Sequence, residues 1–229
     1  MKQKITIPES LNDLTLDQYL RFLKVVDGNT GELFIRKKMV QIFCDIPLLT
    51  VEKIKITDFE RITGQIVQVL NETPDLTPRF SLNGTDYGFI PDLDKDMSLA
   101  EFVDLDNLTG NWDEMVQFMS ILYRPITKKK GNKYTIEPYK AKKFKDLEGM
   151  PLGIAIGAQL FFWRLGTQLL QLMTNYGLKA LQTKEIQERL PKVSGKDGVG
   201  IHQFQTSLTT TSQELMKYLG KSFIPPYII

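Results

Sequence analysis

The spacing of apolar residues changes near residue 75, and this change limits the folds that the chain can adopt. Before it, three segments carry apolar side chains at the spacing of a helix face, namely residues 15–28, about 31–45 and 57–70. Thr15 with Gln18, and Thr57 with Glu60, match the capping box that begins a helix, and Ser98 with Glu101 match it before a further helix through Phe102. The sequence therefore predicts a helical region over residues 1–75.

Residues 79–89 follow a different period and surround the dipeptide Asn83-Gly84. An Asn-Gly pair supplies the two positive φ angles of a type I′ turn, so the segment predicts a β-hairpin. Pairing across this turn puts Phe80 opposite Tyr87, on one apolar face that another part of the protein must cover.

A second hairpin is predicted at residues 124–137, with arms at 124–127 and 133–137. Pro125 and Pro138 each lack a backbone N–H, which predicts that this hairpin lies at a sheet edge. An edge strand is open to pairing with another chain.

Residues 150–181 carry the longest regular pattern in the sequence. Polar side chains recur every three or four residues from Arg164 to Lys179, which predicts a long helix that is buried around most of its circumference. The uncharged run 151–163 is shorter than the roughly 20 residues of a membrane span, so no membrane partner is predicted. The expected fold class is mainly α: a helical α+β protein with two small β hairpins and a long helix in its C-terminal half.

Three regions are expected within one compact unit: helices over 1–75, the hairpins over 76–148, and the long helix with an extended tail over 149–229. Pro225 and Pro226 keep the last residues out of a helix. The tail nevertheless carries apolar side chains, namely Phe223, Ile224, Tyr227 and Ile228. Two alternatives stay open for it: the tail folds back on its own core, or it docks on a neighbouring molecule.

Charge is strongly polarised between two neighbouring windows. Residues 71–114 hold eleven acids and two bases, a net charge of −9, and residues 124–145 hold nine bases and one acid, a net of +8. The residues expected to mediate contacts are Arg124, Lys128, Lys129, Lys130, Lys133, Lys140, Lys142, Lys143 and Lys145, with Asp92, Asp94, Asp96, Asp104 and Asp106. The windows either pair within the chain or bring the basic hairpin of one copy to the acidic face of the next.

Catalytic residue types are scarce, because the chain has one histidine, His202, and one cysteine, Cys44. Asp92, Asp94 and Asp96 resemble the start of a calcium loop, but glycine is missing at its sixth position and glutamate at its twelfth. The sequence therefore predicts no enzyme activity, no metal site and no cofactor.

Contact with nucleic acid is an alternative for the basic window, because Tyr134, Tyr139 and Phe144 are interleaved with its lysines. The neighbouring acidic window would repel a nucleic-acid strand, so contact between proteins is the preferred hypothesis. The first residues lack the apolar stretch of a signal peptide, which predicts a cytoplasmic origin.

Three segments carry a resemblance to proteins encoded by tailed bacteriophages, including crAss-like phages: FMSILYRPI at 118–126, YTIEPY at 134–139 and MPLGIAIGAQLFFWRL at 150–165. The resemblance covers about residues 80–175. It implies a virion structural or morphogenesis protein, such as a head-to-tail ring component, a packaged protein or a tail-assembly chaperone. The implied partners are copies of the chain and other phage structural proteins, and the implied location is the host cytoplasm during assembly and then the particle.

Overall fold

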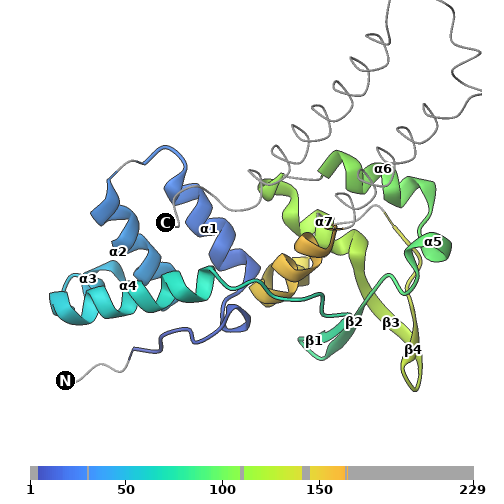
Figure 1. The fold of residues 1–229 in the computed structure, drawn as a ribbon, viewed down its shortest axis with the longest axis horizontal. Helices are drawn as coiled ribbons and strands as arrows, with labels where there is room; N and C mark the ends of the chain where they lie inside the picture. Colours follow the sequence, from blue (N-terminus) through green and yellow to red (C-terminus); the bar gives the residue numbers. More distant parts are fainter. Residues whose placement is uncertain (1–4, 30, 109–110, 141–144, 163, 165–229) are drawn as a thin grey trace, which may run out of the picture. The chain divides into compact units, whose positions relative to one another are not determined.

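The computed structural model describes residues 5–29, 31–108, 111–140, 145–162 and 164. These residues form the helices α1 to α7, a further helical segment from residue 152, and one antiparallel sheet of four strands, so the described part is α+β with helices predominant (Figure 1). One compact unit holds the residues up to Leu160, and a second unit begins at Phe161. All the elements described below belong to the first unit.

Helices dominate the first 70 residues. They are α1 (Leu16–Val26), α2 (Glu32–Phe43), α3 (Leu48–Val51) and α4 (Ile56–Leu70), preceded by a 3₁₀ turn, η1 (Leu11–Asp13). The capping box predicted at Thr15 is confirmed, because the Gln18 amide donates to Thr15 Oγ1 at 3.2 Å and the Thr15 amide donates to Gln18 Oε1 at 2.9 Å. The rings of Phe22 and Phe43, with centroids 5.0 Å apart, join α1 to α2.

The capping box predicted at Thr57 is wrong. Helix α4 already begins at Ile56, and its N-cap, Lys55, makes no side-chain cap. Thr57 therefore lies inside the first turn. Helix α3 was not predicted, because a helix of four residues is too short to show a helical period.

The first hairpin consists of β1 (Arg79–Leu82) and β2 (Thr85–Phe89). Asn83 and Gly84 have φ angles of 50° and 78°, as the predicted turn requires. Phe80 pairs with Tyr87, and their rings stack at 5.4 Å. The local sequence therefore sets both the turn and the strand register.

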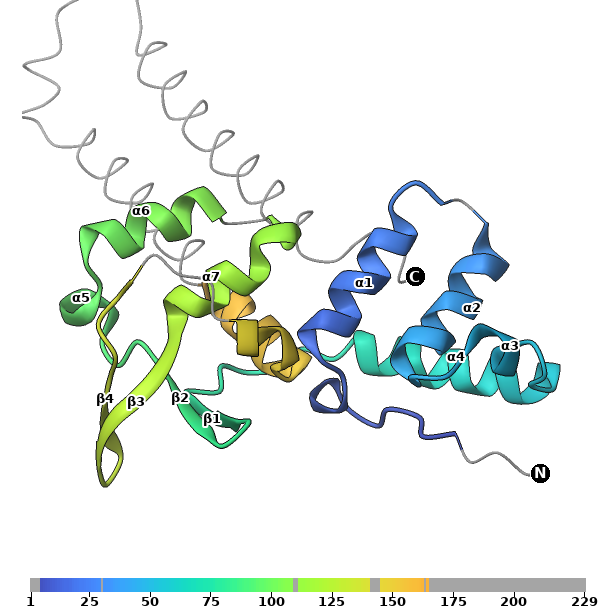
Figure 2. The same cartoon turned by 180° about the vertical axis from the view of Figure 1, so that it is seen from behind.

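The other two strands are β3 (Tyr123–Lys130) and β4 (Lys133–Ile136), and β2 pairs with β3 (Figure 2). The sheet order is β1-β2-β3-β4, so the hairpin lies at a sheet edge as predicted. Its edge strand is β4, whereas β3, which carries Pro125, is an inner strand. The Pro125 carbonyl accepts from the Glu137 amide at 2.9 Å. Because N and C=O of one strand residue face the same side, the missing N–H of Pro125 faces the end of β4, where the ladder stops.

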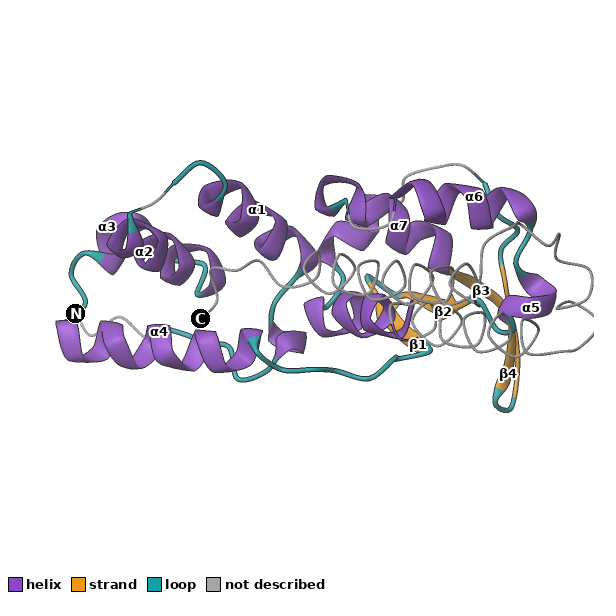
Figure 3. Ribbon diagram, turned by 45° about the horizontal axis from the view of Figure 1, so that its top comes forward, coloured by secondary structure: helices purple, strands orange, loops and turns teal. Residues whose placement is uncertain are grey.

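The segment between β2 and β3 contains α5 (Leu93–Asp96), α6 (Leu99–Leu108), a 3₁₀ turn, η2 (Trp112–Glu114), and α7 (Met115–Leu122). Every residue of α7 except Gln117 is buried, and α7 passes into β3 without an intervening residue (Figure 3). Tyr123 on β3 extends the aromatic face of the sheet, and its ring lies 5.3 Å from those of Phe80 and of Phe89. Tyr87, Phe89 and Tyr123 are buried, so the apolar face predicted for the hairpin is covered.

After β4, η3 (Lys145–Gly149) leads to helical residues 152–160. Two backbone hydrogen bonds attach this segment to the start of α1: Leu16 N donates to Met150 O at 2.9 Å, and Leu152 N donates to Leu14 O at 2.8 Å. A Cβ at Gly153 would lie 2.6 Å from Asn12 Oδ1, and one at Gly157 would clash with the backbone carbonyl of Asp75. Gly153 and Gly157 therefore allow the helical residues 152–160 to pack closely against Asn12 in η1 and against the backbone at Asp75. Most of the long helix predicted over residues 150–181 lies outside the described residues.

Candidate interaction surface

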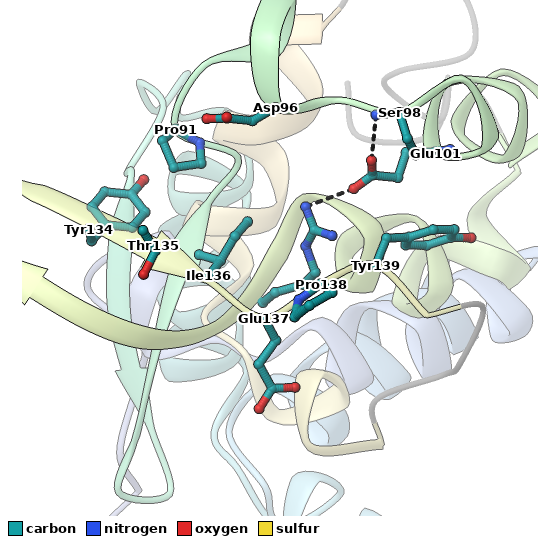
Figure 4. A pocket seen from close by; sticks show the side chains of 11 residues that line it. Pro91, Asp96, Ser98, Glu101, Tyr134, Thr135, Ile136, Glu137, Pro138 and Tyr139 are labelled. Atoms are coloured by element: carbon teal, nitrogen blue, oxygen red, sulfur yellow. Dashed lines mark hydrogen bonds and ion pairs between the residues drawn. The ribbon is translucent and has the colours of Figure 1, made fainter.

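A buried ion pair joins the two windows of opposite charge within one chain. Arg124 Nη2 on β3 lies 2.7 Å from Glu101 Oε1 on α6, and the two side chains are 5% and 2% exposed (Figure 4). The other oxygen of Glu101 accepts from the Ser98 amide at 2.6 Å, which confirms the capping box predicted there. The ion pair therefore fixes the first turn of α6 against the sheet, and Arg124 is not exposed for contact with a partner.

The polar groups of this pair are incompletely satisfied. Arg124 Nε and Glu101 Oε1 are buried and make no hydrogen bond, although Nη2 lies 2.7 Å from Oε1. A buried pair of this kind recovers little more than its desolvation cost. It fixes the position of α6 without adding much net stability.

A second ion pair between the windows lies at the surface. Lys129 Nζ on β3 lies 2.5 Å from Asp86 Oδ2 on β2, and Ser81 Oγ also donates to Asp86. The hydrogen bond from Lys129, helped by the one from Ser81, lowers the pKa of the Asp86 carboxyl below its ordinary value of 3.8. Lys129 is thus engaged by an acid of its own chain.

Replacing Lys129 with alanine is expected to raise the pKa of Asp86 towards 3.8, because the main hydrogen bond to its carboxylate is lost. A carboxyl with a lowered folded pKa stabilises the fold above its unfolded pKa, and this contribution is lost as pH falls through the folded pKa. The loss therefore occurs in acid, below pH 3.8. An NMR titration of the Asp86 carboxyl carbon measures the pKa, and an unchanged value in Lys129→Ala would contradict the assigned cause.

The other basic residues of the window are distributed as follows. Lys128, Lys130 and Lys133 are exposed at the end of the β3–β4 hairpin, and Lys140 is exposed after β4. Lys145 is the first residue of η3, and its side chain is outside the described part. Lys142 and Lys143 also lie outside it. Among the described residues of this window, the exposed bases without an acidic partner are therefore those of the hairpin end and Lys140.

Several of the predicted acidic contact residues have partners within the chain. Asp92 Oδ2 accepts from Lys95 at 2.7 Å, and Asp104 accepts from the Tyr139 hydroxyl. Desolvation, followed by the hydrogen bond to Asp104, raises the pKa of Tyr139 to about 12. Asp96 is exposed, whereas Asp94 in α5 and Asp106 in α6 have side chains outside the described part. The acidic face is therefore smaller than its charge count suggests.

A pocket of about 520 Å³ lies between the start of α6 and β4, lined by Asp96, Ser98, Glu101 and Arg124 together with residues 134–139 (Figure 4). The carboxylate of Glu137 points away from Glu101. The described residues contain no group of three His, Cys, Asp or Glu side chains that could hold a metal ion. Within the pocket lining, Glu101 is engaged by Arg124 and by the Ser98 amide.

Tyr134 crosses the sheet from β4 to β2. Its hydroxyl donates to Phe89 O at 2.7 Å, and its ring occupies the place where a side chain on Gly88 would lie. Tyr139 is likewise half-buried and bonded to Asp104. Neither ring is a free platform for stacking a base, which weakens the nucleic-acid hypothesis.

Helix α6 exposes three large apolar side chains on one face. Leu99, Phe102 and Val103 are 78%, 59% and 46% exposed, and their spacing of three and four residues places them side by side. The opposite side of α6 holds buried Glu101 and Leu105. The sequence placed Phe102 in a helix but gave no sign of this exposure, because the buried face of α6 contains a glutamate.

Comparisons with protein-family models, curated proteins and solved structures find no match to this chain. The described helices include none with the length and apolar composition of a membrane span. The predicted contact residues of the tail, Phe223, Ile224, Tyr227 and Ile228, lie outside the described residues.

Proposed function

We propose that this chain is a non-enzymatic structural protein of a tailed-bacteriophage particle, such as a component of the head-to-tail ring, and that it assembles through contacts with copies of itself and with other particle proteins. The observation that carries the proposal is the exposed face of Leu99, Phe102 and Val103 on α6. Large apolar side chains that share one exposed face favour a protein contact. The assignment to a phage rests on the sequence resemblance, two segments of which fall in α7–β3 and β4.

The chemistry of the described residues supports a structural role. Burial raises the pKa of the Cys44 thiol to about 11, so little of it is thiolate near neutral pH. The Arg124–Glu101 pair positions α6, and the Tyr134 and Tyr139 hydroxyls hold the sheet and α6. The polar groups that a catalytic site would use therefore serve the fold.

The proposed fold includes a long helix through residue 181, and the helical residues 152–160 support it. The two predicted hairpins, β1–β2 and β3–β4, lie in one sheet.

A tail-assembly chaperone, absent from the finished particle, is the alternative function. A packaged protein that contacts nucleic acid is a further alternative, supported by the exposed Lys128, Lys130 and Lys133.

The expected result is that mass spectrometry detects the chain in purified particles. Phe102→Asp is expected to lower its amount there by about tenfold, equivalent to ~1.4 kcal/mol of lost contact, because a charge would enter an apolar interface. Leu49→Asp is the matched control, since Leu49 on α3 is 72% exposed but lies off this face. A chain abundant in infected lysate and missing from particles would identify a chaperone instead. Equal losses in both variants would exclude the α6 face as the contact.

A further inference from the structure

Strand β4 is an edge of the sheet, and its backbone polarity can be assigned. The Glu137 amide donates to Pro125 O at 2.9 Å, and Thr127 Oγ1 donates to Thr135 O at 3.2 Å, so residues 135 and 137 face β3. Backbone groups alternate sides along a strand. The N–H and C=O groups of Tyr134 and Ile136 therefore face the free edge of β4.

A second copy of β4 carries the same free backbone groups. When the two strands run antiparallel and are related by a two-fold axis at Thr135, the free groups of one strand face those of the other. In that register Tyr134 of one copy lies opposite Ile136 of the other, and the two residues can exchange both backbone hydrogen bonds. The same register brings Lys133 of each copy opposite Glu137 of the other. Thr135, β-branched and suited to a strand, meets its own copy on the axis.

The side chains are also complementary in charge. Glu137 and Thr135 point to one side of β4, and Tyr134 and Ile136 point to the other, as alternation requires (Figure 4). Lys133 is exposed and Glu137 is half-exposed, and no ion pair to either is found among the described residues. Opposite charges at facing positions stabilise an antiparallel pair, and the two-fold axis forms this pair twice.

The other edge strand offers no such match. Among its residues, β1 carries one charged side chain, Arg79, so a two-fold pairing of β1 with itself places no acid opposite the base. Short edges with lysine and proline commonly resist pairing because like charges meet. In the two-fold pairing of β4, Glu137 of one copy lies opposite Lys133 of the other. This lysine therefore favours pairing with a second copy of the chain.

We propose that two copies of the chain associate through their β4 strands, antiparallel about Thr135, to form one sheet of eight strands with two Lys133–Glu137 ion pairs. This inference rests on the self-association part of the proposed function and names its surface. The contact involves residues 133–137 of each copy and is small, so the dimer is weak and forms with rising protein concentration.

Analytical ultracentrifugation of the full chain over a concentration series tests the pairing. Lys133→Glu and Glu137→Lys are each expected to raise the dimer dissociation constant at least about tenfold, because both ion pairs become like-charge pairs. An equimolar mixture of the two variants is expected to dimerise again, since position 133 of each variant then faces a side chain of opposite charge at position 137 of the other. The double variant, with both changes on one chain, is expected to dimerise as well.

Lys53→Glu, an exposed charge reversal after α3, is the matched control and should leave the dissociation constant unchanged. Equal thermal midpoints show that the variants are folded. A wild-type chain that stays monomeric at every concentration overturns both the β4 pairing and self-association in solution. If neither charge reversal changes the dimer dissociation constant, the β4 pairing alone is overturned. Mass spectrometry of purified particles tests the virion role separately, so failure of that role can be distinguished from failure of the β4 pairing.

Discussion

Glu101→Gln is expected to lower the free energy of unfolding by about 3–5 kcal/mol, because Arg124 would become a buried cation without a counter-ion. The arginine side chain is 5% exposed and its Nε already lacks a hydrogen bond, so solvent compensates little for the lost counter-charge. Glutamine can still accept from the Ser98 amide as a member of a capping box. The loss therefore reports on the charge and not on the cap.

Urea denaturation measures this effect, and a matched substitution controls for it. Glu52→Gln removes the carboxylate of the partly exposed Lys37–Glu52 pair, and is expected to cost less than about 1 kcal/mol. Replacing both members of the buried pair, as Glu101→Leu with Arg124→Met, is expected to restore most of the stability. Equal effects of Glu101→Gln and Glu52→Gln would show that the buried pair is not a counter-ion pair in solution.

Gly88→Ala is expected to lower the free energy of unfolding by about 1–3 kcal/mol through overpacking. A Cβ on Gly88 would lie 2.8 Å from Tyr134 Cδ2 and 3.0 Å from Ile126 Cγ1, with a still closer contact to Tyr134 Cε2. The ring has little room to move, because its hydroxyl is bonded to Phe89 O.

A double-mutant cycle separates this clash from any change in strand propensity. In a Tyr134→Ala background the space is open, so Gly88→Ala is expected to be neutral or slightly stabilising, since alanine costs less backbone entropy than glycine. Gly64→Ala is the control at a glycine where a Cβ meets nothing within 4 Å. The steric explanation fails if Gly88→Ala costs the same with and without the tyrosine ring.

Local signals in the sequence predicted the parts of the fold that neighbouring residues determine. Thr15 with Gln18 and Ser98 with Glu101 form their capping boxes, and Asn83-Gly84 forms its turn. The predictions that were wrong or incomplete concern features that depend on contacts between residues far apart in the sequence. Pro125 and Pro138 indicated that the second hairpin lies at a sheet edge, but not that β3, which carries Pro125, is its inner strand, because that depends on the pairing of β3 with β2.

The candidate interaction surface was predicted in part for the same reason. Counting charges located the two opposite windows, but not which residues pair within the chain, because Glu101 and Arg124 meet only when α6 packs on β3. The exposed face of α6 escaped prediction because apolar residues at helical spacing normally indicate burial. Here a buried glutamate takes the inner side of the helix, and Phe102 is left outside.

The strand order β1-β2-β3-β4 follows the order of synthesis, so no strand waits for a later one to be inserted between it and its neighbour. As the chain leaves the ribosome, the first hairpin can close by itself, while its aromatic side stays open to water until residues 115–125 have been made. The interval in which a growing chain is most exposed to aggregation therefore lies between the translation of Phe89 and that of Tyr123.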